Sequence, residues 1–156
     1  MRKTFPWLVA ILAVTFLPGM ARAQQDDAYL ELLRSDVKTQ RVAILTEVMQ
    51  FSDSASQVFW PIYRQFELES SKLGDDRIAL IKDYAANYDA LTPEMARDLA
   101  ARFFRNKEDA LKLKKKYFKK VEKALGPVTA AKFIQVENQI DLLIDIQIAQ
   151  GLPLIH

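Results

Sequence analysis

The sequence predicts an all-α fold, with four long, bent helices in a single domain. Glycine and proline are sparse, at 4 and 6 of 156 residues, so few turns interrupt the chain. Asn-Gly and Asp-Gly hairpin turns are missing, and so is period-2 alternation, which argues against strands. Apolar residues instead recur at three- and four-residue spacing along most of the chain. We expect residues 24–156 to form this domain and residues 1–23 to precede it as an export signal.

The first 23 residues have the organisation of a signal peptide. Arg2 and Lys3 give a positively charged start, an apolar run covers residues 7–17, and Ala-Arg-Ala at 21–23 matches an A-x-A cleavage site. The apolar run is shorter than the ~20 residues that a membrane-spanning helix needs. We therefore expect cleavage after Ala23 and a periplasmic location, with an uncleaved anchor as the alternative. The sequence has no cysteine, which excludes lipid attachment through cysteine and disulfide bonds.

The positive charge of the mature chain is concentrated on one segment. Of the 22 lysines and arginines, Arg2, Lys3 and Arg22 belong to the signal, which leaves 19 against 20 acidic residues. The mature protein is thus close to neutral overall. Its basic residues gather between residues 105 and 123, so a basic surface is expected there and not over the whole molecule.

Cap residues mark where the first and third helices begin. Asp36 is a candidate N-cap for a first helix that ends near Gln50. Thr92 is followed by Pro93 and an acidic residue, the strongest helix start in the chain. This third helix is expected to continue to Leu125.

The second helix is predicted to run from the N-cap Ser52 to about Ala90. Its apolar residues keep their helical phase through Gly74, which favours one continuous helix. The alternative is a helix end at Gly74 and a new start directly after it. Pro61 lies inside this helix, where it removes one backbone hydrogen bond, and we expect a kink there.

Gly126 and Pro127 predict a sharp corner between the third helix and a last helix that ends near Gly151. The two helices should form an antiparallel hairpin on which the others pack. The third helix has an apolar side and an opposite basic side. The basic side consists of Lys112, Lys115, Lys116, Lys119, Lys120 and Lys123.

Lys107 and Lys114 interrupt the apolar side of the third helix and need partners if they are covered. On the last helix Glu137, Asp141 and Asp145 stack at four-residue spacing. Folding at the corner brings Lys114 level with Glu137 and Asp141, and Lys107 level with Asp145. We interpret these five residues as an ion-pair ladder that fixes register; independently solvated charges are the alternative. A metal site is disfavoured, because a straight row does not converge on an ion.

Two apolar features point to contacts outside the monomer. The last helix is apolar almost all round apart from its acidic row, so we expect a second copy to cover part of it as a homodimer. Trp60 lies off the apolar stripe of the second helix. It is either an exposed aromatic that, with Tyr63, contacts a partner, or a side chain folded onto the first helix.

The segment Leu91-Thr92-Pro93-Glu94-Met95-Ala96 resembles the Spy/CpxP-like LTXXQ-motif family of periplasmic helical proteins. Residues 51–55 occupy the position of the family's earlier motif, before a long helix. Met95 and Ala55 stand where the motif has glutamine, and Phe51-Ser52 replaces Leu-Thr. The resemblance implies a cradle-like antiparallel homodimer. It further implies holding of unfolded envelope proteins without ATP, or restraint of a membrane sensor.

The residues argue against an enzyme or a nucleic-acid-binding module. The sole histidine is the terminal His156, there is no cysteine nucleophile, and no G-x-S-x-G or phosphate-binding glycine loop is found. No cofactor or metal is expected. The lysines could neutralise phosphates, but export removes nucleic acid as a target. They are better suited to acidic proteins or to peripheral contact with anionic membrane.

The function expected from the sequence is chaperone-like or stress-related protein binding in the envelope. Lys112, Lys115, Lys116, Lys119 and Lys123 would attract acidic, unfolded or partner proteins, and apolar surface around Trp60 and Tyr63 would hold them. The alternative is a dedicated adaptor for one folded envelope partner such as a sensor protein.

If residues 1–23 are an export signal, the protein recovered from the periplasmic fraction should begin at Gln24. Mass spectrometry of the intact protein measures this directly. Substituting Ala23 by a bulky residue should block processing, because the A-x-A site requires small side chains. Recovery from the cytoplasm with residues 1–23 intact would contradict the prediction.

Overall fold

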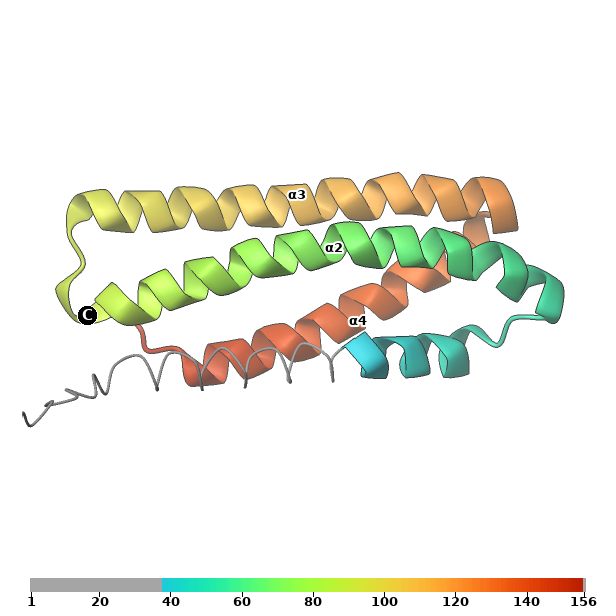
Figure 1. Cartoon of the computed structure of the whole chain (residues 1–156), viewed down its shortest axis with the longest axis horizontal. Coiled ribbons are helices and arrows are strands. Elements are labelled where there is room, and N and C mark those ends of the chain that lie inside the picture. Colours follow the sequence, from blue (N-terminus) through green and yellow to red (C-terminus); the bar gives the residue numbers. More distant parts are fainter. Residues whose placement is uncertain (1–37, 156) are drawn as a thin grey trace, which may run out of the picture. The chain divides into compact units, whose positions relative to one another are not determined.

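The computed structural model describes residues 38–155, and these form helices without any strand (Figure 1). The predicted all-α class is therefore confirmed, with four helices packed together. The helical residues 38–49 come first and are followed by α2 (Asp53–Asn87) and the short 3₁₀ helix η1 (Tyr88–Ala90). Next come α3 (Pro93–Leu125) and α4 (Pro127–Gly151). The predicted signal segment and the N-cap Asp36 lie outside the described residues.

The predicted helix starts are present as capped termini. The Ser52 side chain accepts a hydrogen bond from the backbone N–H of Ala55 at 3.3 Å, which caps α2. Thr92 does the same for Met95 at 3.2 Å, and Pro93 follows as the first residue of α3. Each cap satisfies one backbone donor that a helix start would otherwise leave unpaired.

The long second helix is continuous. α2 runs through Pro61 and Gly74 without interruption, so the prediction of one helix is confirmed over the alternative of two. Pro61 is exposed, and water can therefore hydrogen-bond the carbonyl group that the proline leaves without an N–H partner. Nothing lies within 4 Å of the position where a side chain at Gly74 would begin, so no close packing requires glycine there.

The core forms where α2, α3 and α4 meet in the part of the molecule nearest the Gly126 corner, with the buried α3 and α4 residues confined to 113–121 and 130–140. α2 packs beside α3, and α3 beside α4 (Figure 1). At the centre, Phe66 of α2 makes edge-on ring contacts with Tyr117 of α3, at 5.3 Å between centroids, and Phe133 of α4, at 5.4 Å. Leu45 and Met49 of the first helix complete this core. Aromatic pairs of this geometry add about 0.5–1.5 kcal/mol each beyond the burial of their area.

The corner between α3 and α4 depends on Gly126. Its φ of 87° and ψ of 163° lie in a region that is essentially restricted to glycine. The Gly126 N–H donates to the carbonyl of Glu122 at 2.9 Å, and Pro127 then begins α4. The corner reverses the chain within two residues, and so sets which residues of the two helices face each other.

No helix within residues 38–155 is long and apolar enough to cross a membrane.

Gly126→Ala should destabilise the protein by about 1–3 kcal/mol, because alanine is strained at this backbone conformation. Gly74→Ala is the matched control. It lies in a helix interior with open space around it, so the same change should stabilise by about 0.5–1 kcal/mol. Urea unfolding followed by circular dichroism measures both free energies. Equal effects at the two positions would contradict the assigned corner.

Candidate partner-binding surface

The facing sides of α3 and α4 carry two ion pairs and a hydrogen bond. Lys107 Nζ lies 2.9 Å from Asp145 Oδ2, and Lys114 Nζ lies 2.7 Å from Asp141 Oδ2. Lys114 also donates to the side-chain oxygen of Asn138 at 2.6 Å. Lys107 thus lies opposite Asp145, and Lys114 opposite Asp141, as the position of the Gly126 corner predicts. Their role in fixing register stays a prediction.

Glu137, the third carboxylate of that row, has a different partner from the one expected. It pairs with Arg41 of the first helix, which also reaches Asp141. Arg77 of α2 pairs with Asp145. Sequence reasoning missed both arginines. A signal was available for Arg41. It lies one helical turn before the buried Leu45, so a cation is placed on the apolar side of its helix, as Lys114 is on α3, and such a cation needs a partner.

Glu137 is fully buried, with 0 % of its area exposed. Burial raises the pKa of its carboxyl from 4.5 to about 7, against the opposing influence of the Arg41 and Lys114 cations. The negative charges of Asp141 and Glu67 raise this pKa further. The carboxylate oxygen Oε1 of Glu137 has no hydrogen-bond partner among the described residues. At neutral pH this group therefore lies close to its titration point.

Tyr63 belongs to the core and not to the surface. Only 2 % of it is exposed, and its ring stacks near Phe59 and meets Phe133 edge-on. Burial, and then the charge of Glu137, raise the pKa of its hydroxyl far above the ordinary value. Trp60 is half-buried and packs edge-on against Phe59 and Tyr63. The expected apolar patch around these two side chains is thus largely used for internal packing, and Tyr63 is inaccessible to a partner.

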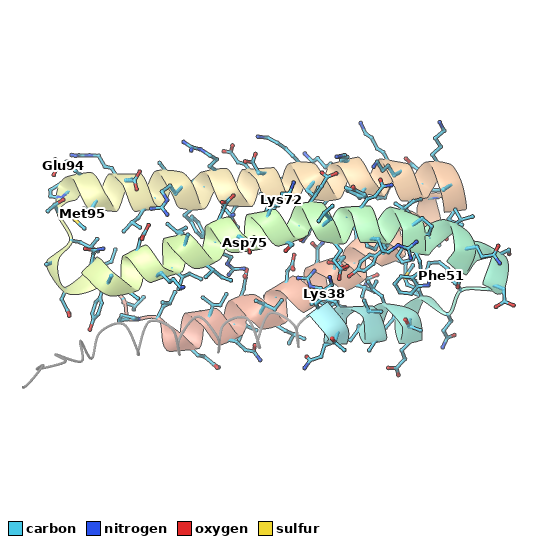
Figure 2. The ribbon with its side chains drawn as sticks, viewed as in Figure 1. Lys38, Phe51, Lys72, Asp75, Glu94 and Met95 are labelled. Atoms are coloured by element: carbon cyan, nitrogen blue, oxygen red, sulfur yellow. The ribbon has the colours of Figure 1, made fainter. Side chains whose placement is uncertain are left out.

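The outer side of α3 carries the predicted basic face, where long nitrogen-tipped side chains project outward (Figure 2). Lys112 pairs with Asp109 at 2.9 Å. Lys116 reaches both carboxylate oxygens of Glu69 at 2.7 Å, and its hydrogen bond, with that of Tyr117, lowers the pKa of Glu69. The other members of the face are exposed and have no ion-pair partner among residues 38–155. They are Lys115, Lys119 and Lys123.

Lys120 is only half-exposed and lies over the ring of Tyr117, 4.4 Å from its centroid. It also donates to the Gln65 side chain at 3.0 Å. This lysine packs between α2 and α3, and we do not count it in the outer basic face. The distinction matters because a lysine held this way contributes less to attracting a partner.

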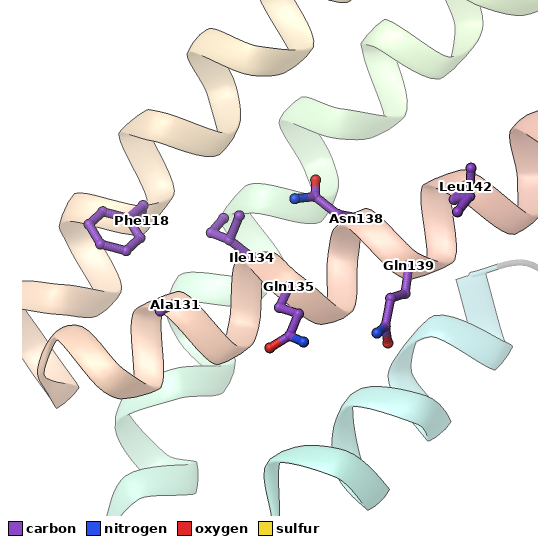
Figure 3. A pocket seen from close by; sticks show the side chains of 7 residues that line it. All are labelled: Phe118, Ala131, Ile134, Gln135, Asn138, Gln139 and Leu142. Atoms are coloured by element: carbon purple, nitrogen blue, oxygen red, sulfur yellow. The ribbon is translucent and has the colours of Figure 1, made fainter.

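Large apolar side chains are exposed beside the basic face. Phe104 is 62 % exposed, Leu111 53 % and, on α4, Leu142 59 %. Between the two helices lies a groove of about 520 Å³ (Figure 3). Phe118 of α3 forms one wall, and residues of α4 form the other. These are Ala131, Ile134, Gln135, Asn138, Gln139 and Leu142.

A second hollow lies at the opposite end of α3, near its labelled first residues Glu94 and Met95 (Figure 2). Arg102 crosses it and pairs with Asp83 at 2.6 Å and Asp98 at 3.4 Å. Arg102 therefore neutralises part of the acidic charge of this hollow, which Asp83, Glu94 and Asp98 supply. In the described part of the chain, no group of three or more histidine, cysteine or acidic residues could hold a metal ion.

Comparisons with known proteins found no matching family model, no matching curated protein and no matching solved structure.

The buried carboxyl of Glu137 predicts a pH-dependent stability. Between pH 4.5 and about 7 the folded protein keeps a proton that the unfolded chain releases, so the free energy of unfolding falls as pH rises. Glu137→Gln keeps the shape and cannot titrate. The variant should therefore lose this slope. The change in the free energy of unfolding between pH 4.5 and about 7 should differ between wild type and variant by up to about 3 kcal/mol.

Glu69→Gln is the control, because the pKa of Glu69 is lowered and its contribution is instead lost as pH falls. Urea unfolding of both variants at a series of pH values measures the slopes. If the wild type and Glu137→Gln show parallel pH profiles, the buried carboxyl does not titrate as stated.

Proposed function

We propose that this is an exported protein of the cell envelope that binds unfolded or partner proteins without ATP, in a chaperone-like or stress-related role. One observation carries the proposal: unpaired lysines and exposed large apolar side chains lie side by side on α3 and α4. Lys115, Lys119 and Lys123 supply the charge, and Phe104 and Leu111 the apolar contact. Exposed apolar groups that border a charged surface are typical of protein-interaction sites.

The proposed mechanism separates attraction from holding. The lysines raise the rate of encounter with acidic segments, an effect that weakens as salt rises. Covering a half-exposed Leu or Phe contributes about 1 kcal/mol, so a few such contacts hold a client only weakly. Weak holding suits a protein that must release its clients without an energy source. Because Tyr63 is buried and Trp60 half-buried, the proposal uses the exposed apolar residues of the α3–α4 side in their place.

The proposal also draws on the resemblance of the segment at the start of α3 to the LTXXQ-motif family. In the segment Leu91-Thr92-Pro93-Glu94-Met95, threonine and proline act as helix cap and first residue. Met95 contributes its backbone N–H to the cap but lacks the amide side chain of the family's glutamine. A threonine cap followed by proline starts helices in many proteins. The resemblance brings the periplasmic location and client holding to this chain as proposals.

The homodimer, cradle-like as the resemblance implies, is part of the proposal. Leu143 and Ile146 of α4 are exposed on the side turned away from α3, where the last helix was expected to need cover. A second copy would shield them. Peripheral contact with anionic membrane is compatible with the same lysines.

The alternative is an adaptor for one folded partner. It is favoured by the groove between α3 and α4, which has a definite shape and lining. A holder of unfolded clients should protect several unrelated proteins, whereas an adaptor should protect none.

In an aggregation-suppression assay with two unrelated acidic clients, the wild type should delay aggregation of both at low salt. Lys115→Glu/Lys119→Glu should lose most of this effect, because the variant repels acidic segments. Lys72→Glu/Lys132→Glu is the matched control, since it makes the same charge change at exposed lysines of α2 and α4. Unchanged suppression in the first variant, or equal loss in both, would refute the proposal.

A further inference from the structure

We propose that the groove between α3 and α4 binds an acidic amphipathic helix of a partner protein. The inference rests on the proposed function and deepens it by naming the site and the chemical class of its ligand.

Phe118, the α3 side of the groove, belongs to a line of apolar residues with the spacing of a helix-packing seam. Phe104, Leu111 and Phe118 are seven residues apart, so they lie in one line along α3 with a drift of only about 20° per step. The line is about 21 Å long at the rise of an α-helix. Side chains repeated every seven residues are the pattern with which one helix packs along another. Its first two members are more than half exposed, and Phe118 is half-buried against the core.

The ion pairs place the α4 wall opposite this line. Leu111 lies between Lys107 and Lys114 on α3, and Leu142 lies between their partners Asp141 and Asp145 on α4. The two leucines are therefore at the same level of the hairpin. Towards the corner, Phe118 and Ile134 line the same groove (Figure 3). The groove and the exposed side chains of Leu111 and Phe104 therefore follow one another along the same side of α3.

A helix fits this surface better than an extended peptide. An extended segment would bring its backbone N–H and C=O groups against apolar side chains, where unpaired groups are costly. Sheet edges, which would pair with such groups, are missing from residues 38–155. A helix satisfies its own backbone and presents only side chains. The groove between two antiparallel helices also has the shape that accepts a third helix.

The charge around the groove selects an acidic helix. Lys115 lies beside the seam, between Leu111 and Phe118, and Lys119 lies behind it; Lys112, also behind it, is paired with Asp109. Glu108 and Glu122 lie on the same rim, so the positive surplus comes from the wider outer side of α3, where Arg105 and Lys123 are also exposed and have no ion-pair partner among residues 38–155. The exposed residues of the α4 wall are uncharged; they are Ala131, Gln135, Asn138, Gln139 and Leu142. The net field is thus positive along one wall and neutral along the other.

A second copy is a poorer match for this charge. The acidic row of α4 is engaged by Arg41, Arg77, Lys107 and Lys114 of the same chain. It cannot supply acidic groups to the groove of a neighbouring molecule. The expected occupant is therefore a different chain.

The test uses a fluorescent peptide of about three heptads, with leucine at the a and d positions and glutamate at the flanking positions, titrated with the full purified chain. One control peptide has the same composition in scrambled order, and another has lysine in place of glutamate. We expect the acidic amphipathic peptide alone to bind. Leu111→Gln/Leu142→Gln should weaken its binding by about tenfold or more.

Two further pairs of variants make the test specific. Lys115→Glu should weaken binding and Glu122→Lys should strengthen it, because each changes the rim charge in a known direction. Leu68→Gln/Val58→Gln removes exposed apolar side chains of α2, outside the groove, and should leave binding unchanged. Circular dichroism and the thermal midpoint confirm that each variant is folded.

Several results would overturn the inference. The first is equal binding of the scrambled peptide. The second is unchanged peptide binding by Leu111→Gln/Leu142→Gln. The third is a wild-type dimer in sedimentation that this variant converts to monomers, which would assign the groove to a second copy. Loss of phosphatidylglycerol-vesicle binding in the same variant, without peptide binding by the wild type, would assign the groove to membrane instead. If aggregation suppression survives while any of these results is found, the inference fails and the proposed function stands.

Discussion

Glu137, Asp141 and Asp145 form a row on α4 that receives cations from the three other helices. Arg41 comes from the first helix, Arg77 from α2, and Lys107 and Lys114 from α3. Like charges stacked on one helix repel each other, so α4 alone gains nothing from this row. The row becomes favourable only when every neighbour is in place. Removing one member of such a network leaves a partly buried charge uncompensated, which is strongly destabilising.

This internal use of charge determines what the surface can do. Because the acidic row is turned toward the other helices, it does not neutralise the lysines on the outer side of α3. The protein is close to neutral in total, yet one side carries a local surplus of positive charge. Aromatic residues show the same division. Phe59, Tyr63, Phe66 and Phe133 fill the core, whereas Phe104 stays more than half exposed beside the lysines.

The fold was largely readable from the sequence because its signals are local. Ser52, Thr92 and Gly126 act through the backbone of their own turn, so the residue types alone predict the helix boundaries. Lys114 and Asp141 were predicted to face each other because they lie at similar distances along the chain from the Gly126 corner. The partner of Glu137 could not be found in this way, because Arg41 is 96 residues distant and its approach depends on how the first helix packs.

The surface was predicted less well than the fold. The basic face is recognisable from periodicity, since lysines opposite an apolar stripe must face water. Whether an aromatic residue is accessible depends on its neighbours in space, and Tyr63 proved to be covered by rings from α2 and α4. Conversely, Leu111 lies on the apolar side of α3 and is still 53 % exposed, because α4 covers that side only in part. Periodicity tells which side is apolar, but not how much of it a neighbouring helix covers.

The last described residues are tied to the middle of the chain by one hydrogen bond. The Tyr84 hydroxyl of α2 donates to the backbone carbonyl of Pro153 at 2.6 Å. The contact holds the C-terminal residues close to the turn between α2 and α3, at the opposite end from the Gly126 corner (Figure 1). A surface or bead attached through the C-terminus would consequently leave the corner and the lysine-rich part of α3 directed toward solution.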